Sequence, residues 1–353
     1  MRKITRDFIL PSAAFGLGRG KIKYYKAEGK APQIGDVVYG VICRVGEHSS
    51  LENVSGRIHI IYDGTKAVFV FGNRYAPDSY EGLVPPEMTD EVDLLARSGL
   101  VGVVKVSNAI MKDPTRIKVL GYVCDETGRI LNTRDFPLIK PKMVVKRNPR
   151  ARMILVCGTS MNSGKSRSAA ACCWALKSMG YNVRASKVTG TASLKDILLM
   201  NDSGANPFAD FTYLGYPSTY LLERDELLGV FNQLDLKYAN NPKNYWVVEF
   251  ADGIIQRETS ILLNSHEVRS RIHKLVFCAN DAFGAIGGLR ILDDFGLTPD
   301  ALSGVCSSSP LHIRELSAFI DIPVFRNIDT DIKQLTDILL RPVSKRYERA
   351  VIG

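Results

Sequence analysis

One short segment constrains the fold of this 353-residue chain more than any other. The apolar run 153–157 leads directly into Gly158, and a helical pattern begins near Gly164. Glycines let successive backbone N–H groups curl around phosphate oxygens, and the first turn of a helix adds a partial positive charge. This order of strand, glycine-flanked loop and helix predicts a phosphate-binding loop. The residues expected to contact a nucleotide are Gly158, Thr159, Ser160, Asn162, Ser163, Gly164, Lys165, Ser166 and Arg167.

Two residues of this loop have the chemistry for nucleotide binding and catalysis. We expect Lys165 to bridge the β- and γ-phosphates and the Ser166 hydroxyl to bind Mg²⁺. Five residues separate Gly158 from Gly164, one more than in the common form of this motif. A chance match to a relaxed pattern is the alternative, and the strand before the loop and the helix after it argue against that alternative.

From residue 153 onward, short apolar runs alternate with helical patterns. In the first such pattern, apolar residues recur at helical spacing from Ala169 to Leu176, and Gly180 ends it. The alternation predicts an α/β domain at 153–353, with a doubly wound, mostly parallel sheet covered on both faces. Ligands of such sheets bind beyond the carboxyl ends of the strands. The runs expected to form strands are 153–157, 182–187, 245–250, 274–280, 301–306 and 323–325.

Residues 1–139 are expected to form a smaller β-rich domain, either a barrel or a sandwich. Turn signals separate its apolar runs, and one short helical pattern intrudes near residues 90–98. The run 35–45 resembles the opening strand of an OB barrel, a fold that often binds single-stranded nucleic acid. Residues 140–152 contain two prolines and six basic residues, which indicates a basic linker. The runs expected to form strands are 36–45, 55–62, 66–71, 99–106 and 116–124.

Positive charge is concentrated in the N-terminal part of the chain. Residues 1–150 carry 24 Lys and Arg against 16 Asp and Glu, whereas the remainder carries 22 against 21. This asymmetry permits an anionic partner such as nucleic acid, and a solvated basic surface is the alternative. The segment 21–26 interleaves lysines with tyrosines, which suits phosphate contacts and base stacking or, alternatively, an ordinary amphipathic strand.

The composition, 45% hydrophobic and 24% charged, is typical of a soluble globular protein. No apolar run approaches the roughly 20 residues that span a bilayer, and the N-terminus lacks the apolar stretch of a signal peptide. We therefore expect a cytoplasmic protein without a membrane partner. The seven cysteines show neither Cys-x-x-Cys pairs nor zinc spacing, which predicts buried, reduced thiols.

The five-residue spacing of the loop resembles that of the dethiobiotin synthetase group of P-loop NTPases, whose loop begins Gly-Thr and ends Gly-Lys-Thr. The likeness covers residues 153–330. The segment Lys187-Val188-Thr189-Gly190 is similar to the end of the family's second strand, Lys-Pro-Val with a nearby glycine. Residues 246–253, Trp-Val-Val-Glu-Phe-Ala-Asp-Gly, resemble the family's Val-Glu-Gly-Ala-Gly-Gly segment.

The resemblance implies roles for further residues. Glu249 matches a carboxylate that binds Mg²⁺ in the family, and its place as a lone acid at a strand end favours the same function. Lys187 matches a lysine that holds the anionic substrate near the γ-phosphate, and a surface lysine is the alternative. Asp202 is a candidate for a second Mg²⁺ carboxylate, with Asp196 as its rival and a solvated helix-end charge as the alternative for both. The resemblance also implies a homodimer.

The chain departs from the family pattern at several positions. Ser160 replaces the acidic residue of the family's Gly-Thr-Asp start, and Ser307-Ser308 replace an Asn-Asp pair that helps to read adenine. Asn280-Asp281 follow the preceding strand instead, so the nucleotide is expected to be ATP or GTP. The Gly-Gly pair after the acid is absent too, which indicates a reshaped substrate loop and a product other than dethiobiotin.

Three functional hypotheses follow. The leading one is an Mg²⁺- and nucleotide-dependent enzyme that transfers the γ-phosphoryl group to a small anionic acceptor, a carboxylate, in a ligase-like or kinase-like reaction. In it, Lys165 and Lys187 are the catalytic residues, while Ser166, Glu249 and Asp202 hold the metal. The second is a nucleotide-switched binding protein whose N-terminal barrel holds nucleic acid or a protein. The third is a scaffold that binds nucleotide without turnover.

Overall fold

The computed structural model describes residues 1–5, 7–140 and 149–342, and these form two compact units. Of the predicted basic linker 140–152, residues 141–148 lie outside the described residues. The sequence predicts a single domain boundary at this linker. In the structure, two later segments also belong to the unit of the N-terminal residues. The first unit contains residues 1–140, 190–195 and 210–222. The second unit contains residues 149–189, 196–209 and 223–342.

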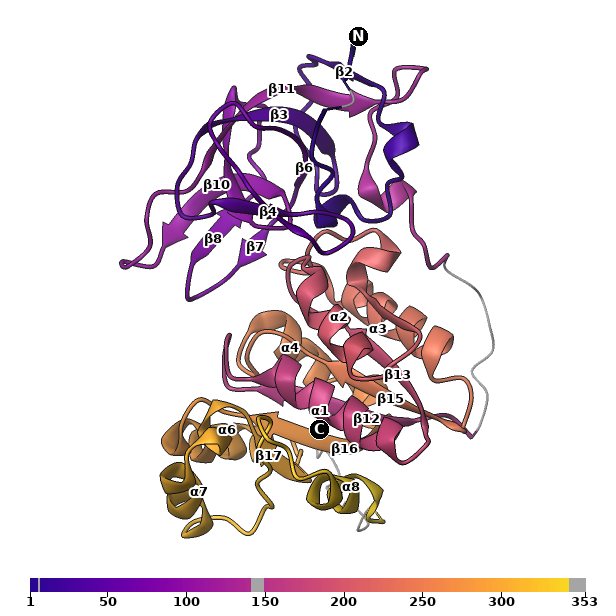
Figure 1. Ribbon diagram of the computed structural model, residues 1–353, viewed down its shortest axis with the longest axis vertical. Helices are drawn as coiled ribbons and strands as arrows, with labels where there is room; N and C mark the ends of the chain where they lie inside the picture. The colour runs from indigo at the N-terminus through magenta and orange to yellow at the C-terminus, as the bar shows by residue number, and fades with distance from the viewer. Residues whose placement is uncertain (6, 141–148, 343–353) are drawn as a thin grey trace, which may run out of the picture. The chain divides into compact units, whose positions relative to one another are not determined.

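The first unit is built on β-strands (Figure 1). Short 3-10 helices, at Ser12–Ala14, Arg19–Lys21, Thr133–Asp135 and Phe211–Leu214, connect them. The strands are β1 (Arg2–Lys3), β2 (Tyr24–Lys26), β3 (Val37–Arg44), β4 (Ser50–Glu52), β5 (Ile58–Ile60), β6 (Lys66–Phe71), β7 (Arg74–Tyr75), β8 (Tyr80–Leu83), β9 (Glu91–Ala96), β10 (Leu100–Ser107) and β11 (Arg116–Cys124).

Five of these strands close into a barrel. β11 pairs with β3, β3 with β6, β6 with β10, β10 with β9, and β9 returns to β11. All of these pairs are antiparallel except β6–β10. Along β6, Phe69 and Phe71 join a cluster with residues of all five strands, which places them inside the barrel. Val68 and Val70 lie on the other face and pack under the N-terminal segment, so alternation along the strand fills both layers.

The helix predicted near residues 90–98 is wrong, because this segment forms β9. Val92 and Leu94 face the barrel interior, while Leu95 and Ala96 join a second buried cluster. A strand buried on both faces loses the regular alternation that identifies a strand in a sequence. The carboxylate of Asp93, a buried polar residue of this strand, accepts hydrogen bonds from Arg116 at 2.6 Å and from the Val104 amide at 2.8 Å.

The two later segments of the first unit, 190–195 and 210–222, are held by hydrogen bonds. The Ala192 amide donates to the Pro217 carbonyl at 3.0 Å, which joins the two segments to each other. The Thr133 hydroxyl donates to the Gly215 carbonyl at 2.8 Å. Ala192 also packs in the core cluster of the N-terminal segment. These segments are therefore integral to this unit although the chain reaches them 50 or more residues after the barrel strands.

The second unit contains a six-stranded sheet with the order β14-β13-β15-β12-β16-β17. The pairings β13–β15, β15–β12, β12–β16 and β16–β17 are parallel. The strands are β12 (Arg152–Gly158), β13 (Asn182–Lys187), β14 (Phe208–Asp210), β15 (Asn244–Glu249), β16 (Ile272–Cys278) and β17 (Ala301–Ser303). The helices are α1 (Lys165–Ser178), α2 (Leu194–Asp202), α3 (Arg224–Tyr238), α4 (Arg257–Leu263), α5 (His266–Arg269), α6 (Ala282–Asp294), α7 (Pro310–Ser317) and α8 (Ile332–Leu340).

Helices cover both faces of this sheet. α1 lies across β12, β13, β15 and β16 (Figure 1). On β15, the neighbours Tyr245 and Trp246 point to opposite faces, as successive strand residues must. Trp246 packs against Phe231 of α3, and Tyr245 packs against Tyr181, just beyond α1. The fold is thus α/β, with a doubly wound, mostly parallel sheet, as the sequence predicts.

Two predicted strands are shorter than the apolar runs that indicated them. β17 ends at Ser303, because Gly304 turns the chain with a φ of 102° and residues Val305–Ser308 form a 3-10 helix. Near residues 323–325 the structure has a single bridge between Leu302 and Val324. Within the described ranges, no helix has the length and apolar character needed to cross a membrane.

Candidate functional site

The predicted phosphate loop lies between the carboxyl end of β12 and the start of α1. Gly164 precedes α1 in the left-handed region, with a φ of 91°, and no side chain of the described residues caps the helix. The first amides of an α-helix have no partner within the helix, so this turn presents unpaired N–H groups together with the positive end of the helix dipole. An uncapped helix start behind a glycine loop is a binding site for an anion such as phosphate.

The backbone of this loop is held on one side by β16 and by the segment after β15. The Thr159 amide donates to the Cys278 carbonyl, and the Ile254 amide donates to the Gly158 carbonyl, both at 2.9 Å. A Cβ on Gly158 would lie 2.6 Å from the Cys278 carbonyl oxygen. A Cβ on Gly253 would press on Thr159 and come within 3.1 Å of the Ser160 Cα. Both glycines are therefore required by close backbone packing.

The other side of the loop rests on the segments that follow β17. The Val305 amide donates to the Ser163 carbonyl at 3.2 Å, and the Asn327 side-chain amide donates to the Gly164 carbonyl at 3.2 Å. A Cβ on Gly164 would lie 2.9 Å from the Cα of Gly304. Backbone contacts from three parts of the chain thus fix the loop in one shape before any ligand binds.

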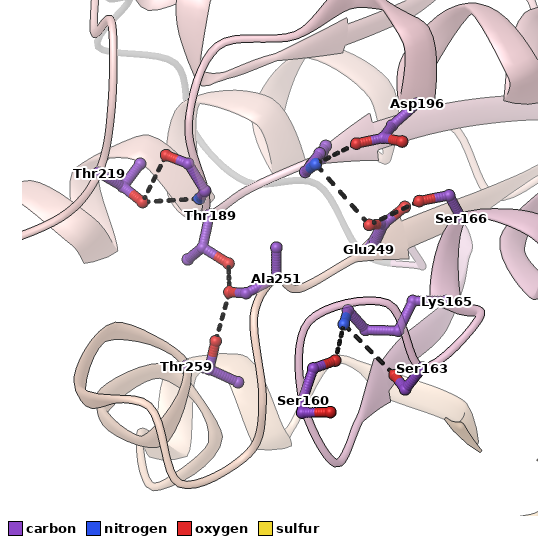
Figure 2. Close-up of polar contacts among 12 residues, drawn as sticks. Ser160, Ser163, Lys165, Ser166, Thr189, Asp196, Thr219, Glu249, Ala251 and Thr259 are labelled. Atoms are coloured by element: carbon purple, nitrogen blue, oxygen red, sulfur yellow. Dashed lines mark hydrogen bonds and ion pairs between the residues drawn. The ribbon is translucent and has the colours of Figure 1, made fainter. Parts of the chain in front are cut away.

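Lys165 is folded back onto the loop that it is predicted to serve (Figure 2). Its side chain is buried, and its ammonium donates to the Ser160 carbonyl at 2.6 Å and lies 3.4 Å from the Ser163 hydroxyl. These contacts place the positive charge inside the loop. A bound phosphate there would gain a charged hydrogen-bond donor.

Ser166 and Glu249, the two main predicted metal ligands, meet in the structure. The Ser166 hydroxyl donates to Oε1 of Glu249 at 3.2 Å (Figure 2). Glu249 ends β15 and is only 1% exposed, and within the described part of the chain its Oε2 has no hydrogen-bond partner. Burial raises the pKa of Glu249, against the opposing charges of Lys187 and Lys165.

This pair fits Mg²⁺. A hydroxyl oxygen beside a carboxylate is a donor set that Mg²⁺ prefers, and Mg²⁺ in nucleotide sites takes one or two protein ligands plus phosphates. The unpartnered Oε2 is the atom that a cation would satisfy, because a buried carboxylate oxygen without a partner is otherwise costly.

Lys187 lies next to this pair. Its ammonium forms an ion pair with Asp196 and lies 3.9 Å from Oε1 of Glu249. Burial disfavours the charged form of Lys187, but the carboxylates of Asp196, Glu249 and Asp252 outweigh it and raise its pKa. The lysine predicted to hold an anionic acceptor is therefore already surrounded by anions.

Of the two aspartates considered for a second metal carboxylate, the structure brings Asp196 into this cluster. Asp196 lies in the first turn of α2 and pairs with Lys187. Asp202 is the last residue of the same helix and is exposed, and the structure does not bring it together with Ser166 and Glu249. The two lie six positions apart, which corresponds to about 9 Å along a helix, so they cannot substitute for each other.

The remaining predicted loop residues have different environments. The Ser160 hydroxyl donates to the Met161 carbonyl and accepts from the Asn280 amide, both at 3.0 Å. Asn162 has a φ of 61° and is exposed, as is Arg167 on α1. The Thr159 hydroxyl is buried and has no hydrogen-bond partner in the described ranges.

One residue of the site, Asn327, was not found from the sequence; it contacts the loop at Gly164, and the signal available was its place just beyond the apolar run that ends in Phe325. Asn280, which the sequence connects with the choice of nucleotide, contacts the loop at Ser160. Asp281, which the sequence pairs with Asn280, instead caps α6 by accepting from the Gly284 amide at 2.7 Å. Ser307, predicted to lie where adenine is read, is buried and donates to the Gly304 carbonyl at 2.7 Å.

The segment 21–26 of the first unit has its charges and rings in contacts within that unit. Lys23 pairs with Glu126, and Lys26 pairs with Glu28 at 2.5 Å. Tyr25 packs against Tyr39 with ring centroids 5.3 Å apart. Of this segment, Tyr24–Lys26 form β2, and Lys21 ends a 3-10 helix.

The cysteines are thiols, as expected. All seven are free, and each except Cys43 is buried. Burial raises the pKa of Cys278, at the floor of the loop, to about 12. The thiol is therefore the form present at neutral pH.

Comparison with known proteins finds only distant structural similarities. No protein-family model and no curated protein matches the sequence. Among solved structures, the chain is similar to FtsY from Mycoplasma mycoides, with 12% identity and a TM-score of 0.32 over 55% of this chain and 68% of that one. It is also similar to the signal recognition particle receptor FtsY from Elizabethkingia anophelis in complex with GDP, with 10% identity and a TM-score of 0.36 over 60% and 70%.

Likeness at this level carries no argument about function, so the fold rests on the chain's own geometry. A central parallel strand, β12, runs through the glycine loop into the uncapped start of α1, and Glu249 ends the neighbouring strand β15. This arrangement is the fold of a P-loop NTPase.

Proposed function

We propose that this protein binds a nucleoside triphosphate with Mg²⁺ and transfers its γ-phosphoryl group. The observation that carries the proposal is the contact between Ser166 and Glu249 beside an uncapped helix start, with the second carboxylate oxygen of Glu249 buried and unpartnered. A phosphate loop alone binds anions. The added carboxylate and hydroxyl pair supports a bound nucleotide that carries a divalent cation.

The residues of the loop would have separate roles in binding the nucleotide and the metal. The amides at the start of α1 would hold phosphate oxygens, and Lys165 would leave the Ser160 carbonyl to contact the β- and γ-phosphates. Ser166 and Glu249 would hold Mg²⁺, which neutralises charge on the phosphate oxygens when it is bound. Because the loop is fixed by backbone contacts, its donors need little rearrangement as charge develops in the transition state.

The family resemblance supplies the ligase-like version of this proposal, in which Lys187 orients a small carboxylate. That version requires Lys187 to bind an anion from outside. In the structure its ammonium is engaged by Asp196 and lies close to Glu249. The geometry therefore supports a bound nucleotide and a bound metal. It gives no comparable support for a carboxylate acceptor.

Binding of slowly hydrolysed ATP and GTP analogues with Mg²⁺, measured by calorimetry, tests the proposal. Lys165→Ala removes a donor worth two charged hydrogen bonds, about 3 kcal/mol, so we expect at least about 100-fold weaker binding. Lys177→Ala, an exposed lysine on the same helix, is the matched control and should bind as the wild type does. Equal affinity of Lys165→Ala and wild type would refute nucleotide binding at this loop.

The metal part has its own measurement. Wild-type affinity for the nucleotide should fall when Mg²⁺ is removed with EDTA. Glu249→Gln should reduce that dependence, because an amide cannot supply the anionic ligand. The same Mg²⁺ dependence in Glu249→Gln as in wild type would show that Glu249 does not hold the metal.

A further inference from the structure

Two carboxylates lie close to the buried ammonium of Lys187, and a third acts on it through its charge. Asp196 pairs with it, Oε1 of Glu249 lies 3.9 Å from it, and the charge of Asp252 contributes to its raised pKa. If Glu249 binds Mg²⁺ as proposed, two carboxylates still face one lysine. An acid cluster of this size is more than a single metal ligand requires, which raises the question of what Asp252 does.

Asp252 sits in a segment that is fixed firmly to the phosphate loop. The carbonyl of the preceding residue, Ala251, accepts hydrogen bonds from the hydroxyls of Thr189 and Thr259 (Figure 2). Both threonines are almost completely buried. The following residue, Gly253, packs so closely on the loop that a side chain would collide with Thr159. Asp252 is itself half-buried, and the residues on both sides of it are held in place by these contacts.

This position is next to the predicted site of the γ-phosphate. Gly253 packs on Thr159 and Ser160, and the Ser160 carbonyl is the group that Lys165 contacts at 2.6 Å. Lysines in this type of loop reach the β- and γ-phosphates. One residue therefore separates Asp252 from the stretch of loop where the transferred phosphoryl group would lie.

The charges around this position disfavour an anionic acceptor. A carboxylate entering beside Asp196 and Asp252 would meet like charges, which cost several kcal/mol when they are partly desolvated. A hydroxyl group carries no charge, and its proton must leave during attack on phosphorus. A fixed carboxylate beside the γ-phosphate is the group that accepts such a proton in phosphoryl transfer.

The orphaned oxygen of Glu249 is an independent sign that a ligand belongs here. Glu249 is 1% exposed, lies in the same cluster and leaves Oε2 without a partner among the described residues. This oxygen is therefore an acceptor that a bound cation would occupy.

We propose that Asp252 orients and deprotonates the nucleophile, and that the nucleophile is an uncharged hydroxyl, water included, rather than a carboxylate. This inference rests on the proposed function. The hydroxyl oxygen forms a bond to the γ-phosphorus while the bond from phosphorus to the β,γ-bridging oxygen breaks. The nucleoside diphosphate leaves with that electron pair, and the proton of the hydroxyl passes to the Asp252 carboxylate.

The test compares Asp252→Asn with wild type in the full-length chain. Asparagine keeps the shape but cannot accept the proton, so we expect turnover to fall at least about 100-fold, with Mg²⁺-nucleotide affinity within about threefold of wild type. Asp294→Asn, an exposed aspartate on α6, is the matched control and should leave both quantities unchanged. Asp252→Glu, which restores a carboxylate, should recover part of the lost turnover, and it replaces Asp252→Asn as the test if that variant does not fold.

The two proposals fail in different ways. If wild type does not bind Mg²⁺-nucleotide, the proposed function fails. If wild type binds and turns over and Asp252→Asn turns over within threefold of it, only the role of Asp252 fails. Wild type that binds nucleotide and forms no nucleoside diphosphate with water, glycerol or acetate also overturns the inference.

The identity of the nucleophile is read from the product. In ¹⁸O-labelled water without an acceptor, label in the released phosphate identifies water. With glycerol, a phosphate ester seen by ³¹P NMR identifies an alcohol, and either product supports the inference. With acetate, hydroxylamine traps any acyl phosphate as a hydroxamate, and acyl phosphate formed equally by wild type and Asp252→Asn would overturn it.

Discussion

Gly304→Ala should both destabilise the second unit and loosen the phosphate loop. Gly304 has a φ of 102° and a ψ of −161°, a region occupied almost only by glycine, where another residue costs about 1–3 kcal/mol. A Cβ would also press on the Ser163 carbonyl and lie 2.7 Å from the amide nitrogen and carbonyl oxygen of Ala279. These are backbone atoms that cannot swing away, so overpacking adds about 1–3 kcal/mol.

The expected loss is thus about 2–6 kcal/mol, a large part of the roughly 5–15 kcal/mol that holds a domain together. Urea unfolding followed by tryptophan fluorescence measures it, because both tryptophans, Trp174 and Trp246, belong to the second unit. Nucleotide affinity should fall as well, since Ser163 would be displaced.

Gly229→Ala is the matched control. Gly229 lies in α3, and an added Cβ there meets nothing within 4 Å. Alanine should therefore stabilise that helix by about 0.5–1 kcal/mol. A loss below 1 kcal/mol for Gly304→Ala, or a change in stability no different from that of the control, would refute the claim that the backbone of this turn supports the loop.

Three further outcomes are expected. Asp235→Asn should cost about 3–5 kcal/mol in urea unfolding, because the buried Asp235 neutralises Arg150 at 2.8 Å and Arg271 at 3.2 Å; a loss under 1 kcal/mol would contradict this. Burial lowers the pKa of His48 to about 4, whereas the pKa of a histidine in the unfolded chain is about 6.5. Because the unfolded chain takes up this proton at a higher pH than the folded chain, the free energy of unfolding should fall by at most about 3 kcal/mol as the pH drops from about 6.5 to 4. His48→Gln should remove that fall in pH-dependent circular dichroism melts. Asn327→Ala should weaken nucleotide binding by about 1–2 kcal/mol, whereas unchanged affinity would show that its bond to the loop is not needed.

The parts of the fold that follow local patterns could be predicted from the sequence. β13 was located at its bounds, 182–187, because Gly180 ends the preceding helix and the run that follows is short. The loop 158–164 was predictable because its glycines and the Lys165-Ser166 pair that follows form one continuous stretch of sequence. Glu249 was predictable because it is the lone acid at the end of an apolar run.

The rest depends on contacts between distant residues. Asn327 contacts Gly164 across 163 positions, and no local spacing indicates such a pair. Asp196 rather than Asp202 joins the cluster because α2 begins just before Asp196 and presents its first turn to Lys187. β9 looked helical because two different cores bury its two faces, and only the closed barrel provides both.

The composition of the first unit has a consequence for the order in which the chain can fold. Its strands are complete by residue 124, but segments 190–195 and 210–222 belong to the same unit. Glu52 of β4 accepts from the Leu194 amide at 2.8 Å, so a carboxylate of this unit has its partner in a residue that is made much later.

At about 5–20 residues per second, the roughly 80 residues from 140 to 222 take roughly 4–16 seconds to synthesise. By the end of that interval β12, the phosphate loop and β13 have been made as well. The first unit is therefore complete only after residue 222, when part of the second unit has already been synthesised. A fragment cut at the basic segment would lack the residues that finish it.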